Sequence, residues 1–127
     1  MGQIIRISCK KCESVWEVKT GMGMDHAFLE NCLDDFDASE KDQIKSSLSQ
    51  KEFPHFTFMY SAAVCNNCKK IISIAELEDL DISKKYTAAC PDCGMSDVNI
   101  IDSNIGSCKC PKCGHYKLSS EISGLWD

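Results

Sequence analysis

Hydrophobic positions gather into short runs on either side of Cys-x-x-Cys motifs. Residues 4–7 and 15–18 are two such runs, rich in β-branched residues, and they predict an antiparallel hairpin around the first motif. Residues 55–60 and 71–74 flank a second motif in the same way. Further short strands are expected at residues 98–101 and 116–118. The pattern therefore predicts a chain built mainly from short strands joined at cysteine-bearing turns.

The segment between the first two motifs has helical spacing instead. Its apolar positions recur every three or four residues, on one face of a predicted helix: Phe28, Leu29, Cys32, Leu33 and Phe36. The order Ser-Glu-Lys-Asp from Ser39 resembles a capping box and predicts a second short helix, with Ile44 and Leu48 on its apolar side. We interpret residues 24–52 as an acidic two-helix insertion.

Cysteine is the residue type that most changes this picture, with ten in 127 residues. The N-terminus lacks the apolar stretch of a secretory signal, and no segment has the ~20 apolar residues of a membrane helix. We therefore expect a cytoplasmic protein, in which disulfides are rare and metal binding is the leading role for cysteine pairs. Eight of the ten form four Cys-x-x-Cys pairs: Cys9 and Cys12, Cys65 and Cys68, Cys90 and Cys93, Cys110 and Cys113. Two pairs complete a tetrahedron of thiolates, so the chain predicts two four-cysteine sites.

The last two pairs are near copies of each other. Both read Cys-Pro-x-Cys-Gly, from Cys90 and from Cys110, with 16 residues between the pairs. Proline fixes the backbone after the first cysteine, and glycine after the second permits the positive φ that closes the turn. On these residues, the segment from about 84 to 120 resembles a zinc ribbon with rubredoxin-type knuckles, similar to uncharacterised bacterial zinc-ribbon proteins. The resemblance implies a fold type and no particular molecular role.

The partners of the first two pairs can be assigned in two ways. The favoured assignment joins Cys9/Cys12 to Cys65/Cys68, across an insertion that costs little loop entropy. This gives a small metal-bound α+β protein with two zinc ribbons, the first at residues 1–83 with the insertion at 24–52, the second at 84–127. The alternative is interleaved, with Cys65/Cys68 sharing an ion with Cys90/Cys93 and the outermost pairs sharing the other.

Three further residues could contribute to a metal site but have a simpler interpretation. Cys32 falls on the apolar helix face, where a cysteine is usually a small core residue. Cys108 lies two residues before Cys110 and is read as a strand residue beside the site. His115 follows the last knuckle and is read as an exposed strand residue.

Four thiolates leave no open coordination position, which is typical of structural rather than catalytic zinc. We expect two zinc ions per chain, with iron as the alternative because tetrahedral thiolates suit both metals. The chain contains no G-x-S-x-G, H-E-x-x-H or P-loop motif, so we predict that it is not an enzyme. An iron-bound, rubredoxin-like electron carrier is a less favoured function.

Charge decides between the two remaining classes of partner. The formal charge is −5, and each zinc held by four thiolates adds −2, so two sites bring the chain to about −9. Such a surface repels a phosphate backbone, which disfavours nucleic acid and leaves nucleic-acid binding as the alternative function. We predict a protein-interaction module with no membrane partner. The acidic insertion and four aromatic residues are its candidate surface: Phe28, Phe36, Phe53 and Trp126.

Overall fold

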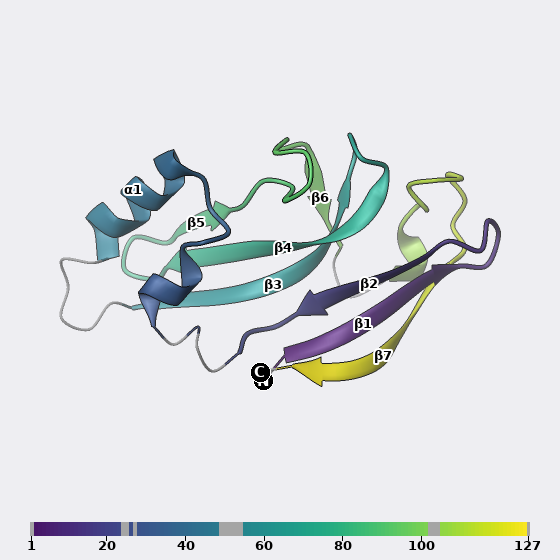
Figure 1. Cartoon of the computed structure of the whole chain (residues 1–127), viewed down its shortest axis with the longest axis horizontal. Coiled ribbons are helices and arrows are strands. Elements are labelled where there is room, and N and C mark those ends of the chain that lie inside the picture. The colour runs from purple at the N-terminus through teal and green to yellow at the C-terminus, as the bar shows by residue number, and fades with distance from the viewer. Residues whose placement is uncertain (1, 24–25, 27, 49–54, 102–104, 127) are drawn as a thin grey trace.

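Two antiparallel sheets form the framework of the described chain (Figure 1). The structure, a computed structural model, describes residues 2–23, 26, 28–48, 55–101 and 105–126. The terminal sheet has the order β2-β1-β7 and contains β1 (Gly2–Cys9), β2 (Val15–Thr20) and β7 (Leu118–Trp126). The central sheet has the order β5-β4-β3-β6 and contains β3 (Phe56–Cys65), β4 (Lys70–Asp79), β5 (Lys84–Thr87) and β6 (Val98–Ile100). The helical elements are η2 (Leu29–Cys32), α1 (Ala38–Leu48) and η3 (Ile105–Ser107).

The two sheets are nested in the sequence. Strand β7 pairs antiparallel with β1, in a register that runs from Gly2↔Trp126 to Cys9↔Leu118. The two ends of the chain therefore close the terminal sheet, while the central sheet is formed entirely by the segment between them. Each sheet combines strands from both sides of the predicted boundary between residues 83 and 84.

The two predicted hairpins are confirmed, and their strands are longer than the apolar runs suggested. In the first, β1 pairs with β2 from Gln3↔Thr20 to Ser8↔Val15. In the second, β3 pairs with β4 over ten residues on each strand. Val18 of β2 and Phe58 of β3 are buried, so each hairpin contributes side chains to the core, and β4 is buried at most of its positions.

The prediction of a two-helix insertion is wrong. The described residues contain one α-helix, α1, and the first predicted helix is instead the short 3-10 element η2. The segment after η2 carries Asp34, Asp35 and Asp37, and aspartate competes for backbone hydrogen bonds and disfavours helix interiors. Helix α1 begins at Ala38 rather than Ser39, because Asp37 Oδ1 accepts a 2.8 Å hydrogen bond from the Glu40 N–H and caps it. Residues 49–52 of the predicted insertion lie outside the described residues.

The predicted apolar positions of the insertion are buried from Cys32 onward, although the first predicted helix does not form and Phe28 is exposed. Cys32, Leu33 and Phe36 are buried, as are Ile44 and Leu48 of α1. They pack against the central sheet in one cluster of ten buried residues: Cys32, Leu33, Phe36, Ile44, Leu48, Phe58, Ala75, Leu77, Tyr86 and Ala88. No helix in the described residues is long and apolar enough to cross a membrane.

The two sheets contact each other near the end of β2. Gly21 and Tyr60 form an isolated antiparallel bridge, and the Ser73 hydroxyl donates a 2.7 Å hydrogen bond to the Lys19 carbonyl. Trp126 donates from its indole Nε1 to the Thr20 carbonyl at 3.2 Å and lies edge-on to the Tyr60 ring. The last aromatic residue of the chain thus packs at the junction between the sheets.

Candidate metal centres

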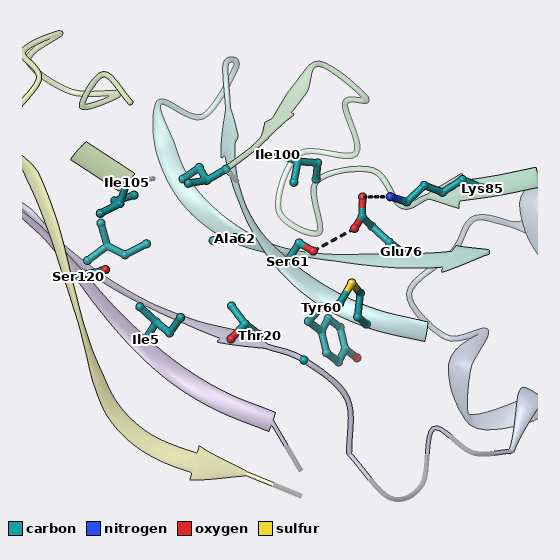
Figure 2. Close-up of a pocket in the computed structure, with 14 residues that line it drawn as sticks. Ile5, Thr20, Tyr60, Ser61, Ala62, Glu76, Lys85, Ile100, Ile105 and Ser120 are labelled. Carbon is teal, nitrogen blue, oxygen red and sulfur yellow. Dashed lines mark hydrogen bonds and ion pairs between the residues drawn. The ribbon is translucent and has the colours of Figure 1, made fainter. Parts of the chain in front are cut away.

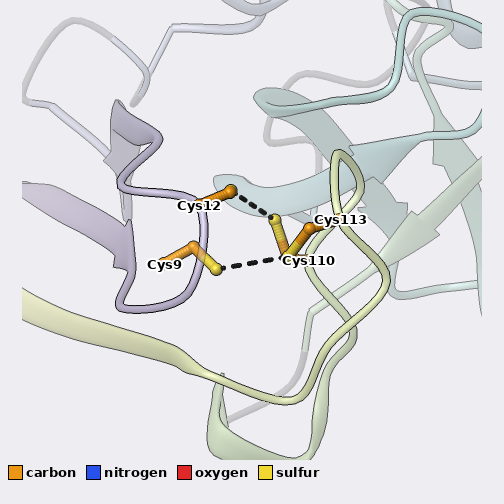
Figure 3. A group of neighbouring side chains, drawn as sticks. All are labelled: Cys9, Cys12, Cys110 and Cys113. Carbon is orange, nitrogen blue, oxygen red and sulfur yellow. Dashed lines mark hydrogen bonds between the residues drawn. The ribbon is translucent and has the colours of Figure 1, made fainter.

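Eight cysteines form two groups of four, and the pairing is the interleaved one. One group contains Cys9, Cys12, Cys110 and Cys113 (Figure 3). The other contains Cys65, Cys68, Cys90 and Cys93. Within each group all four sulfur atoms lie within 4.8 Å of one another. The favoured assignment from the sequence, which joined the first two pairs and the last two pairs, is therefore wrong.

Strand pairing explains why the interleaved groups form. The Cys9↔Leu118 register places the knuckle that precedes β7 beside the β1–β2 turn, and the Lys10 N–H donates to the Lys117 carbonyl at 3.0 Å. In the same way, Cys65↔Val98 places the knuckle that precedes β6 beside the β3–β4 turn. Each metal centre therefore joins one hairpin turn to the loop before the strand that extends that hairpin.

The sulfur positions fit a tetrahedral metal ion. Cys9 Sγ lies 3.6 Å from Cys113 Sγ, and Cys12 Sγ lies 3.6 Å from Cys110 Sγ. In the second group the corresponding separations are 3.6 Å for Cys65–Cys93 and 3.9 Å for Cys68–Cys90. A tetrahedron with Zn–S bonds of ≈ 2.3 Å has sulfur–sulfur edges of about 3.8 Å, so both groups match it.

None of the ten cysteines forms a disulfide, and none of the sulfur–sulfur separations above approaches the disulfide bond length of about 2 Å. The first cysteine of each knuckle is buried (Cys9, Cys65, Cys90 and Cys110), while the second reaches closer to solvent. The buried sulfurs belong to the same hydrophobic clusters as the strands beside them. Each centre therefore lies at the edge of a hydrophobic core, where it fixes a hairpin to its third strand.

The four knuckles share one backbone conformation. In each, the residue after the second cysteine donates its N–H to the carbonyl of the first cysteine, at 2.8–2.9 Å. That residue has positive φ in every case: Glu13 (63°), Lys69 (57°), Gly94 (73°) and Gly114 (75°). Two knuckles therefore use glycine, as their sequences predicted, and two adopt the same turn with a side chain present.

This difference predicts that the knuckles can be stabilised. A non-glycine residue in the left-handed region costs roughly 1–2 kcal/mol, which glycine avoids. We expect Glu13→Gly and Lys69→Gly each to raise the free energy of unfolding of the metal-loaded protein by about 1 kcal/mol. Chemical denaturation measures this, and Gly114→Ala is the matched control, which should lose a similar amount. Destabilisation by both glycine variants would contradict the shared turn geometry.

The first group shows how closely spaced thiols interact. Hydrogen bonds of Ser14, first through its side chain and then through its backbone, lower the pKa of Cys12 to about 6. The His115 N–H lowers the pKa of Cys113, but burial and hydrogen bonds with neighbouring thiols outweigh it and raise that pKa to about 12. One thiol thus ionises easily and another resists, as expected for like charges this close. A divalent cation offsets that repulsion.

The second group has the same asymmetry. The backbone N–H of Met95 is the main cause that lowers the pKa of Cys93 to about 6. A hydrogen bond with Cys93 is the main cause that raises the pKa of Cys68 to about 12. The donor set of four soft sulfurs, with some thiols ready to ionise, suits zinc or iron rather than magnesium or calcium.

Cys32, Cys108 and His115 lie outside both groups. Cys32 is fully buried, and its thiol donates to the His26 carbonyl at 3.3 Å. Burial, followed by the charges of Asp35 and Glu30, raises the pKa of Cys32 to about 12, consistent with a core residue. Cys108 is partly buried against the hydrophobic cluster that contains Ile7 and Leu118, and His115 is exposed.

Several residues around the centres were not predicted from the sequence. Ser14 forms a 3.3 Å hydrogen bond with the Cys12 sulfur. Lys70 forms an ion pair with Asp92, which joins the two knuckles of the second group. The only sequence signal for these contacts was proximity to a cysteine, since Asp92 lies inside its motif and Lys70 lies two residues after Cys68.

Comparison with known proteins adds no further assignment. No protein-family model matches the chain, and no match was found among curated proteins or solved structures. The functional interpretation therefore rests on the geometry of the two four-cysteine groups.

Proposed function

We propose that this chain is a non-catalytic protein in which two structural zinc ions hold two nested ribbons, and that the ribbons present a surface to a protein partner. The observation that carries the proposal is the pair of closed four-cysteine groups, each with tetrahedral sulfur spacing. Four thiolates fill the coordination sphere of zinc, which leaves no position for water or substrate. The ions then act through folding, as in other small zinc modules.

Metal analysis of protein purified from its native cell tests this directly. We expect two zinc ions per chain and a colourless protein, because zinc has a filled d shell. A red protein with stoichiometric iron would support the electron-carrier alternative instead. A content of one metal per chain would contradict the assignment of either group.

The aromatic residues suggested by the sequence contribute little to an exposed surface. Phe36 is buried, Trp126 packs between the sheets, and Phe53 lies outside the described residues. Phe28 alone among the described three is exposed, at 61%. The surface for a partner must therefore be sought elsewhere in the described chain.

Strand β7 offers the better surface. It is an edge strand of the terminal sheet, and its Ile122 and Leu125 side chains are 61% and 63% exposed. Edge strands are commonly protected by lysine or proline, and β7 has neither; its one charge, Glu121, is paired with Arg6 at 3.5 Å. An extended protein segment could add to this edge through main-chain hydrogen bonds, with Ile122 and Leu125 as apolar contacts.

Substitutions on the two edges of the terminal sheet test this surface. We expect the double variant Ile122→Lys, Leu125→Lys to lose a partner protein that co-purifies with the native chain, because charged side chains oppose strand addition. Val15→Lys is the matched control, since Val15 is 56% exposed on β2 at the opposite edge, and it should keep the partner. Retention by the double variant, or equal loss by the control, would contradict the assignment of β7.

One observation favours nucleic-acid binding as the second candidate. A hollow of about 370 Å³ is lined by one cysteine of each metal centre, Cys65 and Cys110, and by the polar residues Lys69, Lys109, Asn66 and Asn99. A second hollow, which shares Lys69 and Pro111 with the first, adds Lys112, so three lysines line the two hollows. A mobility shift with single-stranded RNA or DNA that weakens with salt and with Lys109→Glu would support this function. No shift at low salt would exclude it.

A further inference from the structure

A cavity of about 680 Å³ opens between the two sheets, away from both metal centres (Figure 2). Its volume falls within the range of small-molecule sites. Ile5 and Ile7 of the terminal sheet form part of one wall, and Ile100 of β6 forms part of the other. The walls are mainly apolar, and the polar side chains on the lining are Thr20, Tyr60, Ser61, Glu76, Lys85 and Ser120.

Glu76 is the principal polar group of this cavity. Its side chain is only 8% exposed, and its Oε2 accepts a 3.0 Å hydrogen bond from the Ser61 hydroxyl. Its Oε1 lies 3.5 Å from the Lys85 ammonium, longer than the 2.7–2.9 Å of a good charge-assisted hydrogen bond. The Lys85 side chain is 57% exposed, so it can move away at little cost. The cavity thus holds a nearly buried carboxylate whose counter-ion is loosely placed.

We propose that this cavity binds a small aliphatic primary amine. The ammonium group replaces Lys85 as the partner of Glu76 Oε1, and the alkyl body lies against the isoleucine walls. An anionic ligand is disfavoured, because a second carboxylate beside Glu76 in a low-dielectric site is repelled. A neutral alcohol gains the apolar contacts but no ion pair. None of the eight grouped cysteines lines this site, and it meets strand β7, the proposed partner surface, at Ser120.

Titration of the zinc-loaded full chain with hexylamine tests the proposal, with hexanoate and hexanol as probes of matched length. Hexylamine should shift the backbone amide NMR signals of Ile5, Ser61 and Ile100 in a saturable manner, at concentrations where hexanoate has no effect. Hexanol should bind at least tenfold more weakly than hexylamine. Equal binding of hexanoate, or no shift at these residues with hexylamine, would overturn the proposal.

Two variants examine the role of the carboxylate. Glu76→Gln keeps the shape and the Ser61 contact but removes the charge, so hexylamine binding should weaken at least tenfold. Lys85→Ala removes the competing ammonium and should tighten hexylamine binding severalfold. Lys84→Ala is the matched control, because Lys84 precedes Lys85 on β5 but interacts with Gln43 instead of lining the cavity. This variant should bind hexylamine as tightly as the native chain does.

These variants keep the proposal testable if one of them folds poorly. Lys85 is too exposed to support the core, so Lys85→Ala remains informative even if Glu76→Gln is destabilised. Unchanged or weaker hexylamine binding by Lys85→Ala would overturn the proposed exchange of counter-ions. Unchanged binding by a folded Glu76→Gln variant would overturn the role of the carboxylate.

Discussion

Replacing Cys110 with serine should unfold the terminal sheet and leave the central sheet folded, whereas replacing Cys90 with serine should unfold both. The reason is the nesting of the sheets. The central sheet and its metal centre come from one continuous segment, from Phe56 to Ile100. The terminal sheet joins the two ends of the chain, and we expect the folded central segment to bring those ends close together.

The size of each effect follows from the energy of the metal centres. A structural zinc site contributes on the order of 10 kcal/mol to folding, while whole domains are stable by about 5–15 kcal/mol. Loss of one centre therefore removes most of the stability of the sheet that depends on it. The terminal sheet also contacts the central sheet through the Gly21–Tyr60 bridge, the Trp126–Tyr60 ring contact and a hydrophobic cluster shared with Ala62 and Ile71. We expect these contacts not to offset the loss of a zinc centre.

Amide hydrogen exchange of the zinc-loaded variants measures this asymmetry. In Cys110→Ser, protection should disappear from β1, β2 and β7 but persist in β3 and β4. In Cys90→Ser, protection should disappear from all five strands. Cys108→Ser is the matched control, since Cys108 lies outside both groups and should keep both metals. Equal protection patterns in the two ligand variants would contradict the nested dependence.

Double serine variants should lose different numbers of metal ions, depending on whether the two substituted cysteines belong to the same group or to different groups. Cys9→Ser combined with Cys110→Ser removes two ligands from one centre, so the protein should retain one zinc ion. Cys9→Ser combined with Cys65→Ser removes one ligand from each centre, so it should retain none. Native mass spectrometry counts the ions directly.

The assignment favoured by the sequence, in which Cys9/Cys12 share an ion with Cys65/Cys68, predicts the opposite result. If Cys9 and Cys65 shared an ion, their double variant would keep one metal, and the Cys9 and Cys110 variant would lose both. The two variants each carry two serine substitutions, so the number of thiols removed is the same. Only the distribution of ligands between the centres differs.

The elements around the cysteines could be predicted from local pattern. The β-branched runs on either side of the first two motifs gave both hairpins, and the knuckle residues were identified from their spacing. The insertion was harder, because the spacing of Cys32, Leu33 and Phe36 reports burial but not helicity. The aspartates of that segment favour turns strongly enough to override the periodic pattern.

The partners of the knuckles could not be predicted from local pattern. The 16 residues between Cys93 and Cys110 are a suitable spacing for these two knuckles to share an ion. A long insertion between Cys12 and Cys65 does not exclude a shared ion either, because the entropy cost of closing a loop grows slowly with its length. The choice depends on the pairing of β7 with β1, a contact between residues more than a hundred positions apart. The turn shared by all four knuckles could also not be predicted at Glu13 and Lys69, because these positions lack the glycine that indicates the turn in the last two knuckles.

The most direct test of the nested metal centres is to replace zinc with NMR-active cadmium and to correlate each ion with the cysteine β-protons bound to it through their sulfurs. The account predicts two cadmium signals. One should correlate with Cys9, Cys12, Cys110 and Cys113, and the other with Cys65, Cys68, Cys90 and Cys93. A cadmium signal that correlates with both Cys9 and Cys65, or with both Cys90 and Cys110, would contradict the account.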